Sequence, residues 1–439
     1  MLSDTIAALA TPPGRSALAV IRLSGDVAFA VAAKVVEDFG SDRPRVSRLA
    51  RFRDRDGTAI DEGLYVAFPG PGSYTGEDLV ELTCHGGLLT PTAVLASLCA
   101  AGARPAAPGE FTRRAVLNGK LDLIQAEAVG DLVDATAPNQ ARAALDQLDG
   151  GLSKRVEQLR SALVELQALL SYAVDFPEED DGPVSPERVA KALGDATAIT
   201  GRMLRTAPAG QRLREGALVV IAGRPNAGKS SLFNALLGTN RTLVSEIPGT
   251  TRDTVEAFTE FKGWPIRLAD TAGIGDFENP VDRLGVEVSH RYLEAADLVL
   301  LCVEGTRDLD PAEQERVSRG AMLLRTKSDL GSGNDGIPVS VVTGEGLDAI
   351  RTEVAGRVFQ QGMALGDMEP VLTRERHRDR LSAAHQQLTA AAAQLPPRGD
   401  PVLVSHHVRA ATEALDELIG VVDVEAVLDR VFASFCIGK

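Results

Sequence analysis

Residues 223–230 read Gly-Arg-Pro-Asn-Ala-Gly-Lys-Ser and fit the pattern GxxxxGK[ST] without a mismatch. The apolar run at residues 218–221 precedes this stretch and predicts a buried strand, and residues 231–236 follow it and predict a helix. A glycine-rich turn in that position directs backbone N–H groups and the positive end of the helix dipole toward a phosphate group. We expect Lys229 to neutralise the β- and γ-phosphates and Ser230 to bind Mg²⁺. The stretch therefore predicts a P-loop α/β module.

A second turn motif, Asp270-Thr271-Ala272-Gly273, follows the P-loop by about 40 residues and ends another apolar run. A carboxylate in this position can hold Mg²⁺ through water. The N–H group of Gly273 can contact the γ-phosphate, and the turn can change shape when that phosphate leaves. At this distance from a P-loop, the motif indicates nucleotide hydrolysis coupled to a conformational switch.

A third motif, Thr326-Lys327-Ser328-Asp329, resembles the NKxD base-reading motif of GTPases. The Asp329 carboxylate would accept hydrogen bonds from the N1–H and N2–H₂ groups of guanine, whereas adenine would leave it unpaired. Thr326 stands where most GTPases have Asn, so some of the Asn contacts are lost. Ser340 is placed to help hold the base, although the following Val341-Val342 departs from the usual pattern. We predict GTP rather than ATP as the ligand.

Residues 245–251, Ser-Glu-Ile-Pro-Gly-Thr-Thr, lie between the first two motifs and predict the first switch segment. Thr251 is our choice for the threonine that reaches Mg²⁺ and the γ-phosphate. The predicted nucleotide-binding residues are Asn226, Ala227, Gly228, Lys229, Ser230, Ser231, Ser245, Glu246, Ile247, Pro248, Gly249, Thr250, Thr251, Asp270, Thr271, Ala272, Gly273, Thr326, Lys327, Asp329 and Ser340.

The regions around these motifs differ in the periodicity of their apolar residues and predict a multidomain chain with α/β and all-α parts. Residues 1–120 predict a mixed α/β domain, with strands near 17–21 and 79–83 and a helix near 90–101. Residues 213–362 predict a Ras-like G domain, because short apolar runs at 218–221, 266–268, 298–301, 322–324 and 337–342 alternate with helical stretches. Residues 121–212 and 363–439 carry apolar stripes of helical period, which include Leu152 to Leu170 and Leu381, Leu388 and Leu395. We therefore predict a discontinuous helical domain into which the G domain is inserted.

Composition narrows the functional class. The chain has 439 residues and a formal net charge of −15, which argues against a protein that grips nucleic acid unaided. The four cysteines form no CxxC pair, so the sequence predicts neither a disulfide framework nor a zinc site. The first residues lack the features of a signal peptide, and no apolar run approaches the roughly 18 residues of a membrane span. We expect a cytoplasmic protein with no membrane association.

The chain resembles the MnmE (TrmE) family of tRNA-modification GTPases, and the resemblance extends beyond the nucleotide motifs. The stretches that carry it are residues 4–15, 74–78, 85–87, 108–112 and 118–123, together with the terminal Phe435-Cys436-Ile437-Gly438-Lys439, which matches the family's CxGK ending. The resemblance covers essentially the whole chain.

The resemblance implies an N-terminal domain that binds 5-formyltetrahydrofolate or a related folate and mediates homodimerisation. By position, the matching folate contacts are Arg22, Glu81, Lys120 and Lys439. A carboxylate suits the pteridine ring, and cations suit the glutamate tail. Without the resemblance, these side chains would be interpreted as ordinary surface charges.

The resemblance also implies GTP hydrolysis that uses K⁺ in place of an arginine finger, when two G domains meet. Asn226 matches the K⁺ ligand, and Ser245, Ile247 and Thr250 would complete the shell. A cation between the β- and γ-phosphates stabilises the developing charge. The family glutamate that orients water matches Asp282, a shorter acid, with Glu278 as the alternative. The predicted catalytic residues are thus Lys229, Thr251 and Asp282.

The family acts with a flavin-dependent partner, MnmG (GidA), which holds the FAD. Together they place an aminomethyl or carboxymethylaminomethyl group on the wobble uridine of certain tRNAs, with a folate supplying the carbon unit. The acidic charge of this chain is compatible with a partner that carries much of the tRNA contact. Cys436 is a possible nucleophile, although a structural thiol is the preferred interpretation. Two alternatives stay open: a ribosome-assembly GTPase of the related cation-dependent group, and a non-catalytic GTP-binding scaffold.

Overall fold

The computed structural model describes residues 4–175, 186–238, 255–270, 291–331, 333, 335–359, 371–395, 400–421, 428, 431–432 and 435–438. The chain forms two compact units, which are described separately below. The first unit comprises residues 1–130 and 416–439, and the second comprises residues 131–415. The first unit therefore joins the two ends of the sequence.

The first unit contains a sheet whose described strands follow the order β3-β4-β5-β2-β1-β6. Its pairs are antiparallel except for β1 and β6, which are parallel. The strands are β1 (Ile6–Leu9), β2 (Leu18–Ser24), β3 (Arg48–Arg53), β4 (Ala59–Phe68), β5 (Leu79–His85) and β6 (Arg104–Pro105). The helices are α1 (Ala28–Val35), α2 (Thr90–Ala101), α3 (Glu110–Leu117) and α4 (Leu123–Asp134), the last of which runs past the unit boundary.

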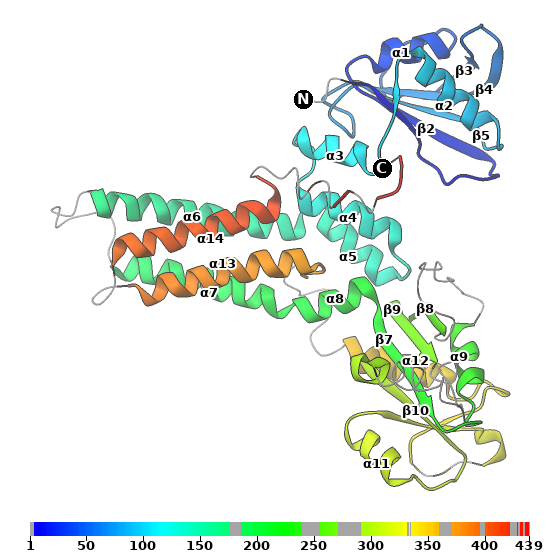
Figure 1. Ribbon diagram of the computed structural model, residues 1–439, viewed down its shortest axis with the longest axis vertical. Helices are drawn as coiled ribbons and strands as arrows, with labels where there is room; N and C mark the ends of the chain where they lie inside the picture. The colour runs from blue at the N-terminus through cyan, green and yellow to red at the C-terminus, as the bar shows by residue number, and fades with distance from the viewer. Residues whose placement is uncertain are drawn as a thin grey trace, which may run out of the picture. The chain divides into compact units, whose positions relative to one another are not determined.

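Alternation along the strands divides this sheet into two faces. Ile21 and Leu23 on β2, with Val80 and Leu82 on β5, are buried in one core together with the apolar residues of α1 and α2. Figure 1 shows α1 and α2 on the same side of the sheet. The intervening residues Arg22 and Glu81 therefore project from the opposite face. That face is only partly apolar, because it carries charged side chains as well as exposed leucines.

The end of the chain belongs to the first unit. Leu428 and Phe432 pack with Leu123 and Ala126 of α4 in a small buried cluster. Gly438 lies against the strand β1 region so closely that an added Cβ atom would be 2.4 Å from the carbonyl oxygen of Leu9. Its φ of +95° is a second reason why glycine occupies this position. The tail is thereby fixed to the first strand of the sheet.

The second unit begins with helices that precede a second sheet in the sequence, and it ends with helices that follow this sheet. They are α5 (Pro138–Leu148), α6 (Gly151–Asp175), α7 (Pro186–Arg205), α8 (Ala207–Glu215), α13 (Glu375–Ala393) and α14 (Pro401–Ile419). Helices α7 and α13 pack along one another, and Thr200 Oγ1 lies 2.7 Å from His385 Nδ1 at their contact. The apolar stripe of α13 is buried at Leu381, Ala384 and Leu388. Segments on either side of the second sheet thus share a core.

The described strands of the second sheet follow the order β12-β11-β10-β7-β9-β8, with every pair parallel except β8 and β9. The strands are β7 (Ala217–Gly223), β8 (Val255–Phe261), β9 (Trp264–Asp270), β10 (Leu298–Glu304), β11 (Met322–Thr326) and β12 (Ile337–Val339). The other described elements are α9 (Lys229–Leu237), α11 (Pro311–Ser318), the short helix η3 (Ser328–Leu330) and α12 (Leu347–Phe359).

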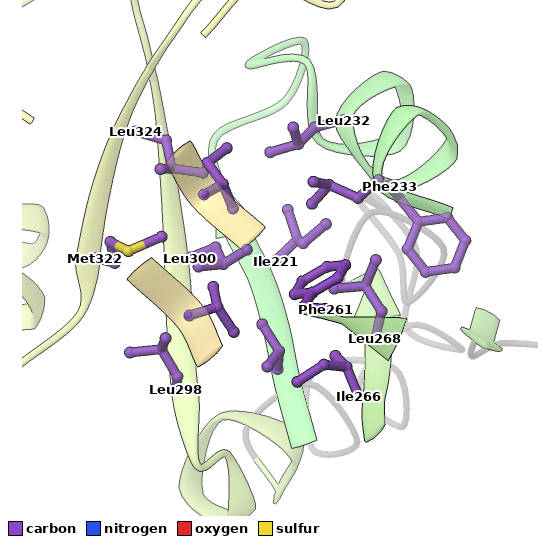
Figure 2. Close-up of a cluster of buried hydrophobic side chains, with 14 of the residues drawn as sticks. Ile221, Leu232, Phe233, Phe261, Ile266, Leu268, Leu298, Leu300, Met322 and Leu324 are labelled. Atoms are coloured by element: carbon purple, nitrogen blue, oxygen red, sulfur yellow. The ribbon is translucent and has the colours of Figure 1, made fainter. Parts of the chain in front are cut away.

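The largest cluster of buried apolar side chains in this α/β module lies on one side of its sheet. Figure 2 shows Ile221 of the central strand β7 between Leu300 of β10 and Leu268 of β9, with Leu232 and Phe233 of α9 covering them. β7 is buried over almost its whole length, as expected for a strand of a parallel sheet that is covered on both faces. The sheet therefore holds the carboxyl ends of β7, β9, β10 and β11 at one edge, where the motif residues follow.

The predicted strands and the helix at residues 90–101 are confirmed, with shifts at some boundaries. β2 starts at Leu18 and continues to Ser24. The prediction that the last strand reaches residue 342 is wrong, because β12 ends at Val339. The reason is local: the Ser340 hydroxyl accepts hydrogen bonds from the N–H groups of Val342 and Thr343 and turns the chain. Leu395 lies beyond the end of α13, so the predicted stripe stops earlier.

No helix among the described residues has the length and apolar character needed to cross a membrane.

Candidate functional site

The P-loop connects β7 to α9 and wraps around the ammonium group of its own lysine. Lys229 Nζ donates hydrogen bonds to the carbonyl oxygens of Gly223, at 2.9 Å, and Arg224, at 2.8 Å. The side chain is buried, with an exposure of 6% for the residue. Gly223 lies so close to β10 that an added Cβ atom would be 2.4 Å from the carbonyl oxygen of Cys302. The lysine is therefore preorganised at the centre of the loop.

The turn of the P-loop depends on two left-handed backbone conformations. Asn226 has a φ of +63° and Gly228 a φ of +83°, and Gly228 is the N-cap of α9. Asn226, Ser230 and Ser231 are exposed, whereas Ala227 is buried. The first N–H groups of α9 have no partner within the helix, and together with the helix dipole they favour an anion at this end. The arrangement can hold a phosphate group.

Asp270 ends β9 beside the P-loop strand. It is paired in register with Ile221 of β7 and is 4% exposed. A carboxylate from this strand and the hydroxyl of Ser230 supply hard oxygen donors, which suit Mg²⁺. The residue types at these two positions therefore fit the Mg²⁺ ion that accompanies a bound nucleoside triphosphate.

Thr326, which replaces the usual Asn of the base-reading motif, connects that motif to the P-loop. Its Oγ1 donates to the carbonyl oxygen of Ala227 at 2.8 Å and lies 3.4 Å from that of Val303. Thr326 is 4% exposed, so the Ala227 contact is a buried hydrogen bond. The hydroxyl therefore holds the base-reading strand against the P-loop.

The base-reading residues themselves are held by neighbouring side chains. Ser340 Oγ donates to Asp329 Oδ1 at 2.6 Å, and Ser340 is completely buried. Lys327 has a φ of +57°, and its ammonium group pairs with Glu304 Oε1 at 2.6 Å. Asp329 is exposed, so one carboxylate is oriented by Ser340 and still open to a ligand. Sequence reasoning missed Glu304, because no motif marks the end of β10.

A second group of predicted residues meets on the face of the first unit's sheet that lies opposite α1 and α2. Arg22 and Glu81 are register partners on β2 and β5, with Nε and Oε1 2.9 Å apart. Arg22 Nη1 lies 3.4 Å from the carbonyl oxygen of Gly438, and its guanidinium lies over the Tyr74 ring at 5.6 Å from the centroid. Strand β2, strand β5 and the C-terminal tail therefore converge here. Tyr74 is an additional member. Its only signal in the sequence is its place in residues 74–78, which resemble the family.

Lys120 and Cys436 lie at the edges of this group. Lys120 Nζ donates to the carbonyl oxygen of Pro71 at 3.0 Å, and its Cγ atom is 3.3 Å from an added Cβ at Gly76. Lys120 thus contacts the loop that carries Tyr74. Cys436 carries an exposed free thiol, and its backbone carbonyl oxygen accepts a hydrogen bond from the N–H of Gly109 at 3.3 Å.

Several predicted residues lie outside the described residues. They are Ser245, Glu246, Ile247, Pro248, Gly249, Thr250, Thr251, Thr271, Ala272, Gly273, Glu278, Asp282 and Lys439.

Matches to known protein families and to individual proteins together span almost the whole chain. The family described as "GTP-binding protein TrmE N-terminus" matches residues 5–120, and the family described as "MnmE helical domain" matches residues 123–436. The "tRNA modification GTPase MnmE" of Sodalis glossinidius (strain morsitans) is 40% identical over 100% of this chain and 99% of its own length. The proteins of the same name from Methylorubrum populi and Moorella thermoacetica are 42% and 41% identical, over 99% and 100% of this chain and 98% and 100% of their own lengths. With a phosphate cradle, a base-reading carboxylate and this similarity from end to end, the chain belongs to the MnmE family of tRNA modification GTPases and is a GTP hydrolase.

Proposed function

We propose that this protein is a potassium-dependent GTP hydrolase that takes part in modifying the wobble uridine of certain tRNAs. In this proposal it acts as a cytoplasmic homodimer with the flavin-dependent partner MnmG, which contributes FAD. The pair would add an aminomethyl or carboxymethylaminomethyl group at C5 of the uridine, and a folate would supply the carbon. The observation that carries the proposal is the convergence of Arg22, Glu81 and Gly438 of the C-terminal tail at one place.

The nucleotide half of the proposal rests on the P-loop. Asn226 is exposed on a turn with positive φ, directly before the residues that cradle phosphate. Its amide oxygen is a suitable ligand for a monovalent cation near the β- and γ-phosphates, where added positive charge stabilises phosphoryl transfer. Ser230 and Asp270 would hold Mg²⁺, and Lys229 would neutralise the phosphates from within the loop.

The folate half of the proposal rests on the first unit. A folate carries a polar ring and an anionic glutamate tail, and Arg22, Glu81 and Lys120 offer one carboxylate and two cations around Tyr74. The same sheet face presents exposed Leu18 and Leu64, with exposures of 57% and 42%. Exposed leucines on the sheet face opposite α1 and α2 support a homodimer that covers this part of the face. We also propose that residues 213–362 form a module inserted into a discontinuous helical domain, which the packing of α7 on α13 supports.

The net charge of −15 supports a division of labour in tRNA binding. A polyanion is repelled by an acidic chain unless a basic partner or a local basic patch offsets the charge. We therefore assign most of the tRNA contact to the flavoprotein partner. Neither alternative function gains a specific observation, since the matched families include the N-terminal domain as well as the helical domain.

The first experiment is steady-state GTP hydrolysis in potassium chloride and in sodium chloride at equal ionic strength. We expect a large stimulation by potassium that is lost in Asn226→Ala. The matched control is Gln314→Ala, which removes an exposed amide on α11 and should keep the stimulation. Equal rates in the two salts, for the chain alone and with its flavoprotein partner, would refute potassium dependence.

A further inference from the structure

Arg224, the second residue of the P-loop, is tied to a helix that no nucleotide motif includes. Its Nη2 atom lies 2.5 Å from Asp310 Oδ2, and its Nε atom lies 3.7 Å from Glu313 Oε1. The main chain of the same residue supplies a carbonyl oxygen that accepts a hydrogen bond from Lys229 Nζ at 2.8 Å. One residue therefore contacts the phosphate-binding lysine through its backbone and an acidic pair through its side chain.

The acidic pair is rigid because it forms the N-terminal cap of α11. Asp310 is the N-cap residue and accepts from the N–H of Glu313 at 2.8 Å, and Glu313 accepts from the N–H of Asp310 at 3.0 Å. Glu313 is 5% exposed and also accepts a hydrogen bond from Arg307 at 2.5 Å. The backbone hydrogen bond from Glu313 and the contact with Arg224 hold the pKa of Asp310 below its ordinary value. The side chain of Arg224 thus contacts two carboxylates that the capping hydrogen bonds hold in place.

We propose that Arg224 is a positioning residue for nucleotide binding, which acts by anchoring the first turn of the P-loop to the cap of α11. The anchor fixes the Arg224 carbonyl, and the carbonyl fixes Lys229 at the centre of the cradle. The inference rests on the GTPase assignment and is independent of the proposed potassium and folate chemistry. It assigns a role in phosphate binding to Asp310, which lies 81 positions along the sequence from Lys229, the lysine that it helps to place.

A direct role for Arg224 in the reaction is less compatible with the geometry. Its guanidinium contacts two carboxylates, so its charge is already offset by Asp310 and Glu313. The pair is also partly exposed, with 56% of the Arg224 side chain and 27% of the Asp310 side chain accessible. Exposed ion pairs contribute little free energy and are screened by salt. The proposal therefore predicts a modest effect with a clear dependence on ionic strength.

The test is a double-mutant cycle on the affinity of the full chain for fluorescently labelled GDP. Asp310→Asn keeps the N-cap hydrogen bond and removes the charge, so it isolates the ion pair. We expect Arg224→Gln and Asp310→Asn each to weaken GDP binding about two- to fivefold at about 0.05 M sodium chloride. The double variant should bind no more weakly than either single variant, and Arg224→Lys should recover part of the loss. At about 0.5 M salt the differences should largely disappear.

The matched control is Arg319→Gln, which removes an exposed ion pair between the C-cap residue of α11 and Glu315 and should leave GDP affinity unchanged. Three results would overturn the proposal. The first is GDP affinity in Arg224→Gln equal to that of the control. The second is additive losses in the double variant. The third is a fall in kcat at saturating GTP larger than the loss of GDP affinity, which would assign Arg224 to the reaction itself.

Discussion

The Oγ1 atom of Thr326 lies 2.8 Å from the carbonyl oxygen of Ala227, which joins the base-reading strand to the phosphate-binding loop by a single buried hydrogen bond. The sequence has Thr where most GTPases have Asn, so some of the Asn contacts are lost. The geometry shows that the hydroxyl keeps the tie to the P-loop. The shorter side chain has only this oxygen to offer, so the tie depends on one group.

Thr326→Val should therefore weaken both folding and nucleotide binding. The substitution keeps the shape of the side chain and leaves the Ala227 carbonyl buried without this partner, at a cost of about 1–3 kcal/mol in the free energy of unfolding. GDP affinity should fall in parallel, because the P-loop loses its contact with β11. Chemical denaturation and calorimetric GDP titration measure the two effects. Thr326→Ser keeps the hydroxyl and should behave like the parent chain, and similar losses in both variants would contradict the role of the hydrogen bond.

Asp329→Asn should relax the preference for guanine. The substitution replaces an acceptor oxygen with an N–H₂ donor, and this group cannot accept from the N1–H and N2–H₂ groups of guanine together. We expect the ratio of GDP to ADP affinity to fall by about tenfold or more, since charge-assisted hydrogen bonds are lost. Competition binding with both nucleotides measures the ratio. An unchanged ratio would remove Asp329 from base recognition.

Arg114→Met should destabilise the first unit strongly. The Arg114 side chain is 1% exposed and pairs with Asp4, Glu77 and Glu110. Asp4 and Glu110 keep their ion pairs with Arg104, but Glu77, which is 11% exposed, loses its cation. Loss of one partner from a buried ion pair costs about 3–5 kcal/mol. Arg51→Met is the control, because Arg51 pairs with Glu62 at the surface and should cost at most about 1 kcal/mol. Equal losses in urea denaturation would show that the buried network does not stabilise the fold.

Stability should fall in alkaline solution partly because of Cys302. Burial raises the pKa of this thiol from 9.0 to about 12. Between these values the unfolded chain releases the proton while the folded chain retains it, so the free energy of unfolding decreases as the pH rises. Cys302→Ala should show a shallower decrease between about pH 9 and 11. Denaturation at several pH values compares the slopes, and parallel slopes would contradict the assignment.

Removal of Lys439 should weaken binding of 5-formyltetrahydrofolate. Lys439 directly follows Gly438 in the sequence, and the carbonyl oxygen of Gly438 lies 3.4 Å from Arg22 Nη1. Loss of a cation near the glutamate tail should reduce affinity by about tenfold. Equilibrium dialysis of the shortened chain measures the change, with Lys34→Ala as a control for an exposed lysine elsewhere in the first unit. Equal affinity in the shortened and parent chains would separate the tail from the folate site.

The elements of the fold were predictable where local patterns determine them. The P-loop, its strand and its helix follow from eight consecutive residues and their neighbours, and α2 has the predicted bounds Thr90–Ala101. The end of β12 was predicted wrongly, because Val341 and Val342 favour a strand by their side chains. The hydroxyl of Ser340 ends the strand before these valines, because it accepts hydrogen bonds from the backbone N–H groups of Val342 and Thr343.

The contacts of the candidate sites were less accessible to prediction, because they join residues that are distant in the sequence. The Thr326–Ala227 hydrogen bond spans 99 residues and the Arg224–Asp310 pair spans 86. Neither pair has a pattern or a spacing that marks it. The positions of Arg22, Glu81 and Lys120 came from the family resemblance, and the geometry adds Tyr74 to them. Sequence patterns identify the reactive groups, whereas the groups that hold them in place require coordinates.

The contact between Arg22 and Gly438 also affects how the protein is made. These residues are 416 positions apart, near the two ends of the chain. A ribosome adds Gly438 to the chain 416 residues after Arg22. The N-terminal sheet can therefore begin to form during translation, but this corner of it stays incomplete until Gly438 has been synthesised. A nascent or prematurely terminated chain that lacks Gly438 would present the GTPase module without a finished N-terminal site.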